Sequence, residues 1–218
     1  MRRVIMRRLA LFLFVWVAGC AASSTPEGGS DASSVKDRLA TPTELTVAAA
    51  GSTGMITAAR YTHDGWVTGE TPLAIAQGEV TASLDKTGKL ETSAFEVDAG
   101  SIEIPDSVFG KPAKLDDVRF TLAQPAVADV TWSSDDDAAV TLTLVLDLDA
   151  SIDVNGSVSP LGTQHLPPVT ITTMLTGAGD HVDAQLSVDA TGTLWNWADL
   201  FKLTELKLSL AAGSVDEM

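Results

Sequence analysis

The sequence is poor in cysteine, basic residues and aromatic residues. One cysteine in 218 residues excludes an internal disulfide, so a hydrophobic core must hold the fold. The 14 basic residues are set against 29 acidic ones, and four of the basic residues lie within residues 1–19. The rest of the chain has 10 basic and 29 acidic residues, a net charge of −19. This charge argues against nucleic acid and anionic membrane surfaces as partners.

Motifs of catalysis and of nucleotide or metal binding are also missing. The sequence has no Gly-x-Ser-x-Gly elbow and no glycine-rich phosphate loop between a strand and a helix. His63, His165 and His181 are scattered, without the spacing of a zinc site. Asp180 and Asp183 flank His181 and could orient its ring, but a solvated turn histidine is the simpler interpretation. We therefore expect no enzyme, no cofactor and no metal.

The one long hydrophobic run lies at the N-terminus. Residues 1–19 join a basic start to the apolar stretch Leu9–Val17, which is too short to span a bilayer, and then to small residues. This pattern predicts a secretory signal peptide. The segment Val17-Ala-Gly-Cys20 is typical of bacterial lipoproteins, in which the cysteine sulfur is acylated before cleavage. Cys20 is the predicted lipidation site, carrying palmitate-type chains, and an ordinary signal peptide with an incidental cysteine is the alternative.

The predicted lipid anchor implies a location and a domain plan. Ala21 stands where an aspartate would favour the inner membrane, so we expect an outer-membrane anchor with the body facing the periplasm or the cell surface. Residues 20–42 combine the acylated cysteine with a segment that has few large apolar side chains, and they predict a flexible tether. Residues 43–218 are predicted to form a single β domain.

Alternating apolar residues predict an all-β body. In Val140–Val154 the even positions are apolar and the odd ones are mostly Thr, Asp or Ser, which predicts one long strand ending at the hairpin signal Asn155-Gly156. Shorter alternations and turn signals predict about eight to ten antiparallel strands. Such strands protect their edges by closing into a barrel or by pairing two sheets. One or two helical turns are expected, over 195–201 and 105–109.

The two halves of the body resemble each other. Lys114–Ala123 aligns with Lys202–Ala211, and the turn residues Gly88 and Gly179 keep a similar spacing upstream of the aligned segments. Chance similarity between alternating strands is the alternative to an internal duplication.

Several segments resemble the YceI-like family of periplasmic β-barrels that bind polyisoprenoids or other lipids. They are Gly78–Asp85, Phe95–Ile102 and Pro168–Ile171, the last preceded by Val154-Asn-Gly156. The resemblance spans about residues 43–214 and implies a lipocalin-like barrel with an apolar cavity. The family's Asp-x-His-Leu segment has no counterpart in 103–118, and its Arg-x-Asp-Phe turn is replaced by Asn196-Trp-Ala-Asp-Leu200, so no ligand contacts are carried over.

The inward-facing residues give two hypotheses of function. Small and aliphatic inward positions, with aromatics near 195–201, suggest a binding module for an apolar ligand such as an isoprenoid or acyl chain. The possible lining residues are Leu142, Leu144, Leu146, Leu148, Ile152, Val188, Trp195 and Trp197. The alternative is a structural or interaction lipoprotein with a solid core, and the aromatics near 195–201 would then plug one end of the body. The acids at 135–137, 147, 149 and 153 are weighed as a calcium site but match a solvated face better.

Overall fold

The computed structural model describes residues 33–178, 181–197 and 200–214. The predicted signal peptide, Cys20 and most of the predicted tether lie outside these residues. Among the residues described, no helix has the length and apolar character needed to cross a membrane.

The described residues are almost entirely antiparallel β-structure, which confirms the predicted all-β class. Two short helices accompany the strands, α1 (Val35–Arg38) and α2 (Asp106–Phe109). The strands are β1 (Thr43–Thr62), β2 (Gly65–Leu73), β3 (Gln77–Leu84), β4 (Leu90–Ile104), β5 (Ala113–Leu122), β6 (Ala126–Ala128), β7 (Val130–Trp132), β8 (Asp137–Leu144), β9 (Leu146–Val154), β10 (Ser157–Pro160), β11 (Gln164–His165), β12 (Val169–Ala178), β13 (His181–Trp197) and β14 (Phe201–Ser214).

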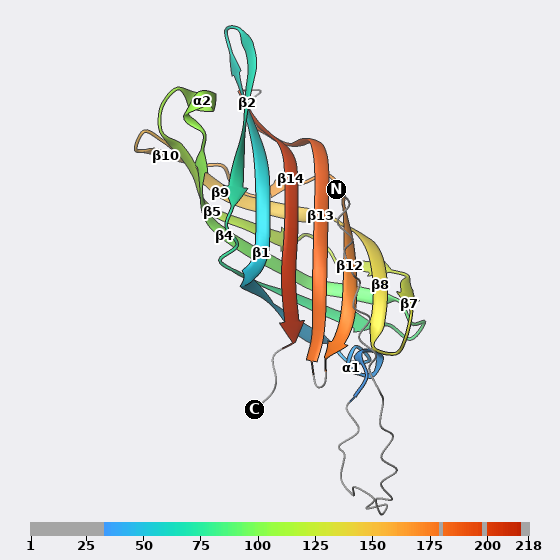
Figure 1. Cartoon of the computed structure of the whole chain (residues 1–218). Helices are drawn as coiled ribbons and strands as arrows, with labels where there is room; N and C mark the ends of the chain where they lie inside the picture. The colour runs from blue at the N-terminus through green and yellow to red at the C-terminus, as the bar shows by residue number, and fades with distance from the viewer. Residues whose placement is uncertain (1–32, 179–180, 198–199, 215–218) are drawn as a thin grey trace, which may run out of the picture. The chain divides into compact units, whose positions relative to one another are not determined.

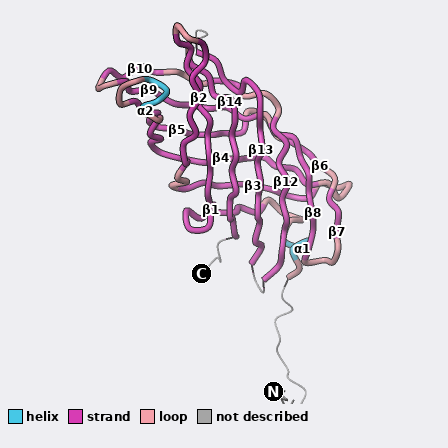
Figure 2. The backbone as a smooth tube through the Cα atoms, turned by 45° about the horizontal axis from the view of Figure 1, so that its top comes forward, coloured by secondary structure: helices cyan, strands magenta, loops and turns pink. Residues whose placement is uncertain are grey.

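All fourteen strands belong to one sheet that folds over into two layers. The order along the sheet is β10-β9-β5-β4-β3-β1-β14-β13-β12-β8-β7, with β2, β6 and β11 paired off this path. In Figure 1 the strands β14, β13, β12 and β8 run lengthwise in front, and β3, β4, β5 and β9 cross behind them. Figure 2 shows the same crossing from another angle. The sheet ends at β10 and β7 and does not close, so the predicted barrel closure is not observed.

The strand number exceeds the prediction of eight to ten. Four of the fourteen strands, β6, β7, β10 and β11, are only two to four residues long. Segments this short carry no recognisable alternation, so sequence periodicity misses them. Short strands at the ends of a sheet also discourage pairing with other molecules.

Strand β1 forms one corner between the layers. Its first residues, Thr43–Val47, pair with β3, whereas Gly54–Thr62 pair with β2. The register to β14 shifts between Ala48 and Thr53, where Gly51 has a φ of 90° that L side chains rarely adopt. The Ser52 hydroxyl accepts a hydrogen bond from the Ala211 N–H at 3.0 Å and so supplies an acceptor within this irregularity.

The β8–β9 junction forms the opposite corner and corrects the prediction of one strand over 140–154. The chain changes layer at Val145, so β8 pairs with β12 and β9 pairs with β5. The Val145 carbonyl accepts a hydrogen bond from the Ala123 N–H at 2.9 Å. The period of two continues through the bend, and Leu144 and Leu146 are both buried. Sequence periodicity therefore identified the inward face but not the corner.

The pairings of the two halves repeat. The corner strand β1 pairs with β3 of its own half and with β14 of the other half. At the opposite corner, β8 pairs with β12 of its own half, and β9 pairs with β5 of the other half. Each half then continues as a meander, β3-β4-β5 or β12-β13-β14. This exchange is what an internal duplication predicts, and it places the similar segments 114–123 and 202–211 in equivalent strands.

The apolar faces of both layers meet in one hydrophobic core. Its largest fully buried members include Phe95, Phe120, Leu144, Leu146 and Ile171. Outward positions on the same strands are mostly polar, as on β8 and β13, where buried and exposed residues alternate. Strands that cross a bilayer in a barrel show the reverse polarity, so the outer surface of this body is built to face water.

Helix α1 lies within the segment predicted to be a flexible tether, and the structure corrects that boundary. Ser34 caps the helix, and Val35 and Leu39 are fully buried. The Leu39 carbonyl accepts a hydrogen bond from the Leu84 N–H at 2.5 Å. Two apolar side chains in a polar segment are thus enough to fix residues 34–39 to the body, and the low overall apolarity of 20–42 concealed them.

The two predicted helical turns have different outcomes. The turn predicted over 105–109 is confirmed as α2, which ends at Gly110 with a φ of 68°. The turn predicted over 195–201 is wrong, because β13 continues to Trp197 and β14 starts at Phe201. Trp195 and Phe201 pack together across this strand pair with ring centroids 5.6 Å apart, which favours the extended backbone.

Candidate functional site

Seven of the eight predicted ligand-lining residues point into the core. Their exposed fractions lie between 0% and 5%, and they come from β8, β9 and β13. These residues are Leu142, Leu144, Leu146, Leu148, Ile152, Val188 and Trp195. Trp197 is the exception, with 40% of its surface exposed. The prediction that it lines the interior is wrong, because Trp197 follows Trp195 on the same face of β13 but is the last residue of the strand, where the core covers it less.

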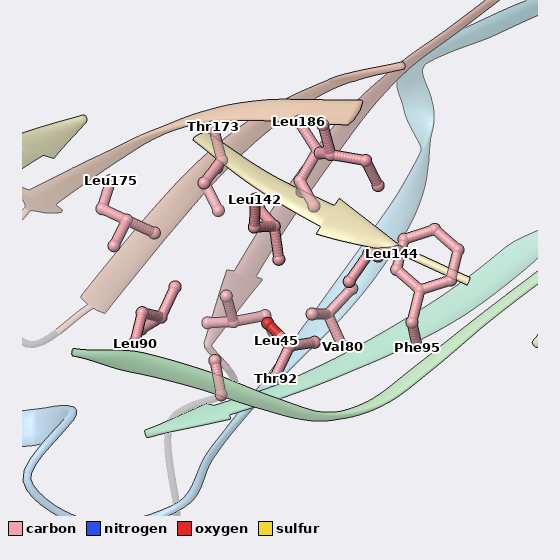
Figure 3. A pocket seen from close by; sticks show the side chains of 13 residues that line it. Leu45, Val80, Leu90, Thr92, Phe95, Leu142, Leu144, Thr173, Leu175 and Leu186 are labelled. Atoms are coloured by element: carbon pink, nitrogen blue, oxygen red, sulfur yellow. The ribbon is translucent and has the colours of Figure 1, made fainter. Parts of the chain in front are cut away.

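A small apolar cavity lies between the layers (Figure 3). Of the predicted lining residues only Leu142 and Leu144 border it, together with side chains such as Leu45, Phe95 and Leu186. The space open to the centre of a water-sized sphere is about 20 Å³. A single water needs about 10–15 Å³ by this measure, so the cavity holds about one water.

Two buried threonines give this apolar cavity its polar atoms. Thr92 and Thr173 both border it, and Figure 3 shows them among the leucines from opposite layers. The Thr173 hydroxyl has no hydrogen-bond partner among the described residues. A buried hydroxyl without a partner is costly, and one water in the cavity would satisfy it. These polar atoms therefore fit a water better than an acyl chain.

Aromatic side chains fill the end of the core where β13 and β14 meet. Phe201 contacts Trp195 and Phe109, with centroid distances of 5.6 and 5.5 Å. The Arg60 guanidinium lies 5.3 Å from the Phe109 ring centroid and donates a hydrogen bond to the Phe109 carbonyl at 3.0 Å. Of the two roles weighed for these aromatics, a cavity mouth or a plug, the buried Trp195 and Phe201 form a plug.

A second aromatic group is exposed at the same end and was missed by the sequence analysis. We call it the aromatic tip and define it as Tyr61, Trp66, Trp197 and Leu200, which are 40–53% exposed. Tyr61 and Trp66 stand across the β1–β2 hairpin from each other, with ring centroids 5.4 Å apart. The available signal was the pair of aromatics on either side of the turn Asp64-Gly65.

The acidic residues considered as a calcium site form hydrogen bonds and ion pairs within the protein. An Asp136 carboxylate oxygen accepts a hydrogen bond from the Val35 N–H of α1 at 3.2 Å, and Asp135 pairs with Lys36 at 3.6 Å. On β9, Asp147 contacts His165 and Asp149 contacts Thr163. Within the described ranges no group of His, Cys, Asp and Glu is placed to hold a metal ion.

Shifted pKa values occur at surface contacts rather than at a cleft. Hydrogen bonds from the Thr87 hydroxyl and the Lys89 N–H lower the pKa of Asp85 in the β3–β4 turn. The Ser101 hydroxyl and then Lys114 lower the pKa of Asp116, and Lys207 and then Thr57 lower the pKa of Glu205. Each shift favours the ordinary charged form at neutral pH, so none of these groups is tuned as a general acid or base.

Comparisons with known proteins identify no family. No family model matches the chain, and no curated protein matches its sequence. The predicted membership of the YceI-like family is therefore wrong. Its carrying segments are alternating strands, which resemble one another across unrelated β proteins.

Two similar solved structures are of Ail, the attachment invasion locus protein of Yersinia pestis. One has a TM-score of 0.38 at 9% identity and covers 79% of this chain and 99% of that one. The other, in complex with the heparin analogue sucrose octasulfate, has a TM-score of 0.35 at 8% identity and covers 79% and 98%. Similarity at this level supports no inference about the activity of this chain.

Proposed function

We propose that this protein is a lipid-anchored, extracytoplasmic β protein with a solid core that acts through its outer surface. The observation that carries the proposal is the interior cavity of about 20 Å³, against a core filled from both layers. The predicted signal peptide and Cys20 support the anchor and the outer membrane as its location. Without residues 1–19 the chain has a net charge of −19, which supports a body that faces water and resists aggregation. Nucleic acid is not a partner in this proposal. No catalytic step or cofactor belongs to the proposal.

The competing function is the binding of a hydrophobic small molecule, such as an isoprenoid or acyl chain, inside the body. The apolar lining of the cavity favours it, since most bordering side chains are Leu, Val, Ile, Ala or Phe. Pockets for small molecules typically enclose about 300–1,000 Å³, so the two layers would have to separate to admit a chain. Separation would expose buried leucines, at a cost of about 25 cal/mol per Å².

Whether the purified protein carries bound lipid decides between these functions. The protein is purified from membranes in mild detergent and analysed by native mass spectrometry and by lipid extraction. It is also titrated with a hydrophobic dye. We expect acyl groups on Cys20, no further lipid and no dye binding. Leu144→Ala is the positive control, because truncating this buried side chain opens space beside the cavity.

Two results would count against the proposal. A stoichiometric isoprenoid or fatty acid on the wild-type protein would establish the ligand-binding function instead. Cys20→Ser should lose the acyl groups detected by mass spectrometry, and acyl groups that persist on this variant would contradict the lipid anchor.

A further inference from the structure

We propose that the aromatic tip, Tyr61, Trp66, Trp197 and Leu200, docks on the surface of a zwitterionic phospholipid bilayer. Four of the seven exposed large hydrophobic residues in the described parts of the chain belong to this tip. The other three, Val127, Val158 and Met174, lie on different strands, β6, β10 and β12. Single exposed apolar residues are ordinary, whereas a cluster of them marks an interaction site.

Strand pairing and backbone hydrogen bonds bring the four residues together at one end of the sheet, with Tyr61 and Trp66 on one face and Trp197, which pairs with Phe201, on the other. The Tyr61 N–H donates to the Leu200 carbonyl at 2.9 Å, which joins the β1–β2 hairpin to the connection between β13 and β14. The Leu200 N–H donates to the Trp197 carbonyl at 3.0 Å. The Lys202 ammonium lies 4.3 Å from the centroid of the Trp66 ring. The aromatic tip is thus preorganised, so docking does not require it to be ordered first.

The residue types fit a membrane interface. Trp and Tyr have an apolar ring and a polar group, which suits them to the boundary between headgroups and acyl chains. Lys202 carries a long apolar stem whose charged end can stay at the headgroup level. Leu200, 53% exposed, supplies a fully apolar side chain.

Charge selects the kind of bilayer. In the sequence, residues 60–66 and 197–202 contain the cations Arg60 and Lys202 and the anions Asp64 and Asp199, which balance. Without residues 1–19 the chain has a net charge of −19, so an anionic bilayer would repel the body while a zwitterionic one would not. This local neutrality in an acidic protein removes the main electrostatic obstacle to contact.

The size of the aromatic tip argues against a second copy of the chain as its occupant. Four half-exposed side chains offer on the order of 400 Å² of surface. A stable protein interface buries about 800 Å² per partner, which is about twice this area. Shallow insertion of a few side chains into lipid has no such threshold, because each buried apolar group contributes on its own.

The tip also lies away from the end where the chain enters the body. Helix α1 contacts β12 and β13 beside the start of β13, and Trp197 is the last residue of that strand. Seventeen extended residues span about 55 Å, and Figure 1 shows α1 and the β1–β2 hairpin at opposite ends of the strands. The inference deepens the proposed surface function by naming the partner, and it rests on that function.

Vesicle binding by an unacylated chain tests the tip alone. Residues 32–218 form one compact unit, so the chain from residue 20 with Cys20→Ser is mixed with phosphatidylcholine vesicles and floated on a density gradient. We expect the protein to float with the vesicles, and Trp66→Ser with Leu200→Ser to reduce the partition coefficient at least about tenfold. The matched control, Val127→Ser with Met174→Ser, removes two equally exposed apolar residues elsewhere and should leave it unchanged. Thermal melts confirm that both variants are folded.

Quenching by brominated phosphatidylcholine gives a second readout. It should reduce the tryptophan emission of the wild type, and Trp66→Phe with Trp197→Phe should abolish the quenching, since Trp132 and Trp195 remain away from lipid. Failure to float, equal loss in the control variant, or tip-dependent self-association in sedimentation would overturn the proposal. Lipid extraction tests the core instead of the tip. An apolar ligand found in the extract would refute the solid core and leave the proposal about the aromatic tip unaffected.

Discussion

At the scale of single residues, the most consequential side chains are the leucines at the corners of the folded sheet. Leu146 is fully buried directly after the bend at Val145 and begins β9. Its side chain is packed within the core cluster, so its neighbours have little freedom to close over a cavity.

We expect Leu146→Ala to lower the free energy of unfolding by about 2–5 kcal/mol, from lost apolar burial and the residual cavity. Urea denaturation followed by circular dichroism measures it. Leu200→Ala is the control, because Leu200 is 53% exposed and its truncation should change stability by less than about 0.5 kcal/mol. Equal effects of the two substitutions would contradict the packing of the corner.

Residue polarity predicted most of the inward face from the sequence. The period of two correctly placed Leu142 to Leu148 in the core, because one-sided burial requires that period. It failed at Trp197, which has the same parity as the buried Trp195 but is the last residue of β13, where the core covers the strand less. The aromatic tip could not be predicted from the sequence for a different reason. Tyr61 and Leu200 are 139 residues apart in the chain, and only the pairing of strands brings them together.

At the scale of elements, strands differ in how many partners hold them. β13 lies between β12 and β14, whereas β2 pairs with β1 alone. The β1–β2 hairpin also carries part of the aromatic tip, which places a functional candidate on an element with one pairing edge.

Hydrogen exchange should therefore distinguish β2 from β13. We expect amides of β2 to exchange at least about 100-fold faster than those in the middle of β13, because opening one hairpin is cheaper than opening the sheet centre. Mass spectrometry of peptides covering 65–73 and 182–190 measures this, and peptides of β14 provide the protected reference. Comparable protection of β2 would mean that its second edge is held by further contacts, such as those with α2.

Element boundaries were harder to predict than element type. The bend at Val145 leaves the apolar period intact, so no local signal separates β8 from β9. Helix α1 depends on an Asp136 carboxylate and a Leu84 amide far along the chain, which the sequence around it does not reveal. Tertiary contacts decided both cases.

At the scale of the whole molecule, charge is the dominant imbalance. The chain without residues 1–19 has 29 acidic and 10 basic residues, and most are on its polar outer surface. Their mutual repulsion opposes compaction and is relieved by salt.

We expect the melting temperature at pH 7 to rise by about 2–4 °C between 10 and 300 mM NaCl, which corresponds to about 1 kcal/mol. The control is the same scan near the sequence pI of 4.3, where the net charge and hence the salt effect should almost vanish. A fall in melting temperature with salt at pH 7 would mean that attractive surface pairs, such as Lys89–Asp129, outweigh the repulsion.

The pairing of the first long strand with the last one has a consequence for biogenesis. Leu45 is registered against Ser214, so β1 can pair with β2 and β3 early but gains β14 on its other edge only when the C-terminal strand exists. Pairings this distant in sequence form slowly, and the layers cannot lock before they do. In a chain leaving the ribosome from its N-terminus, the two layers therefore cannot be joined through β1 and β14 until synthesis is complete. That delay would suit the export in an unfolded state that the predicted signal peptide implies.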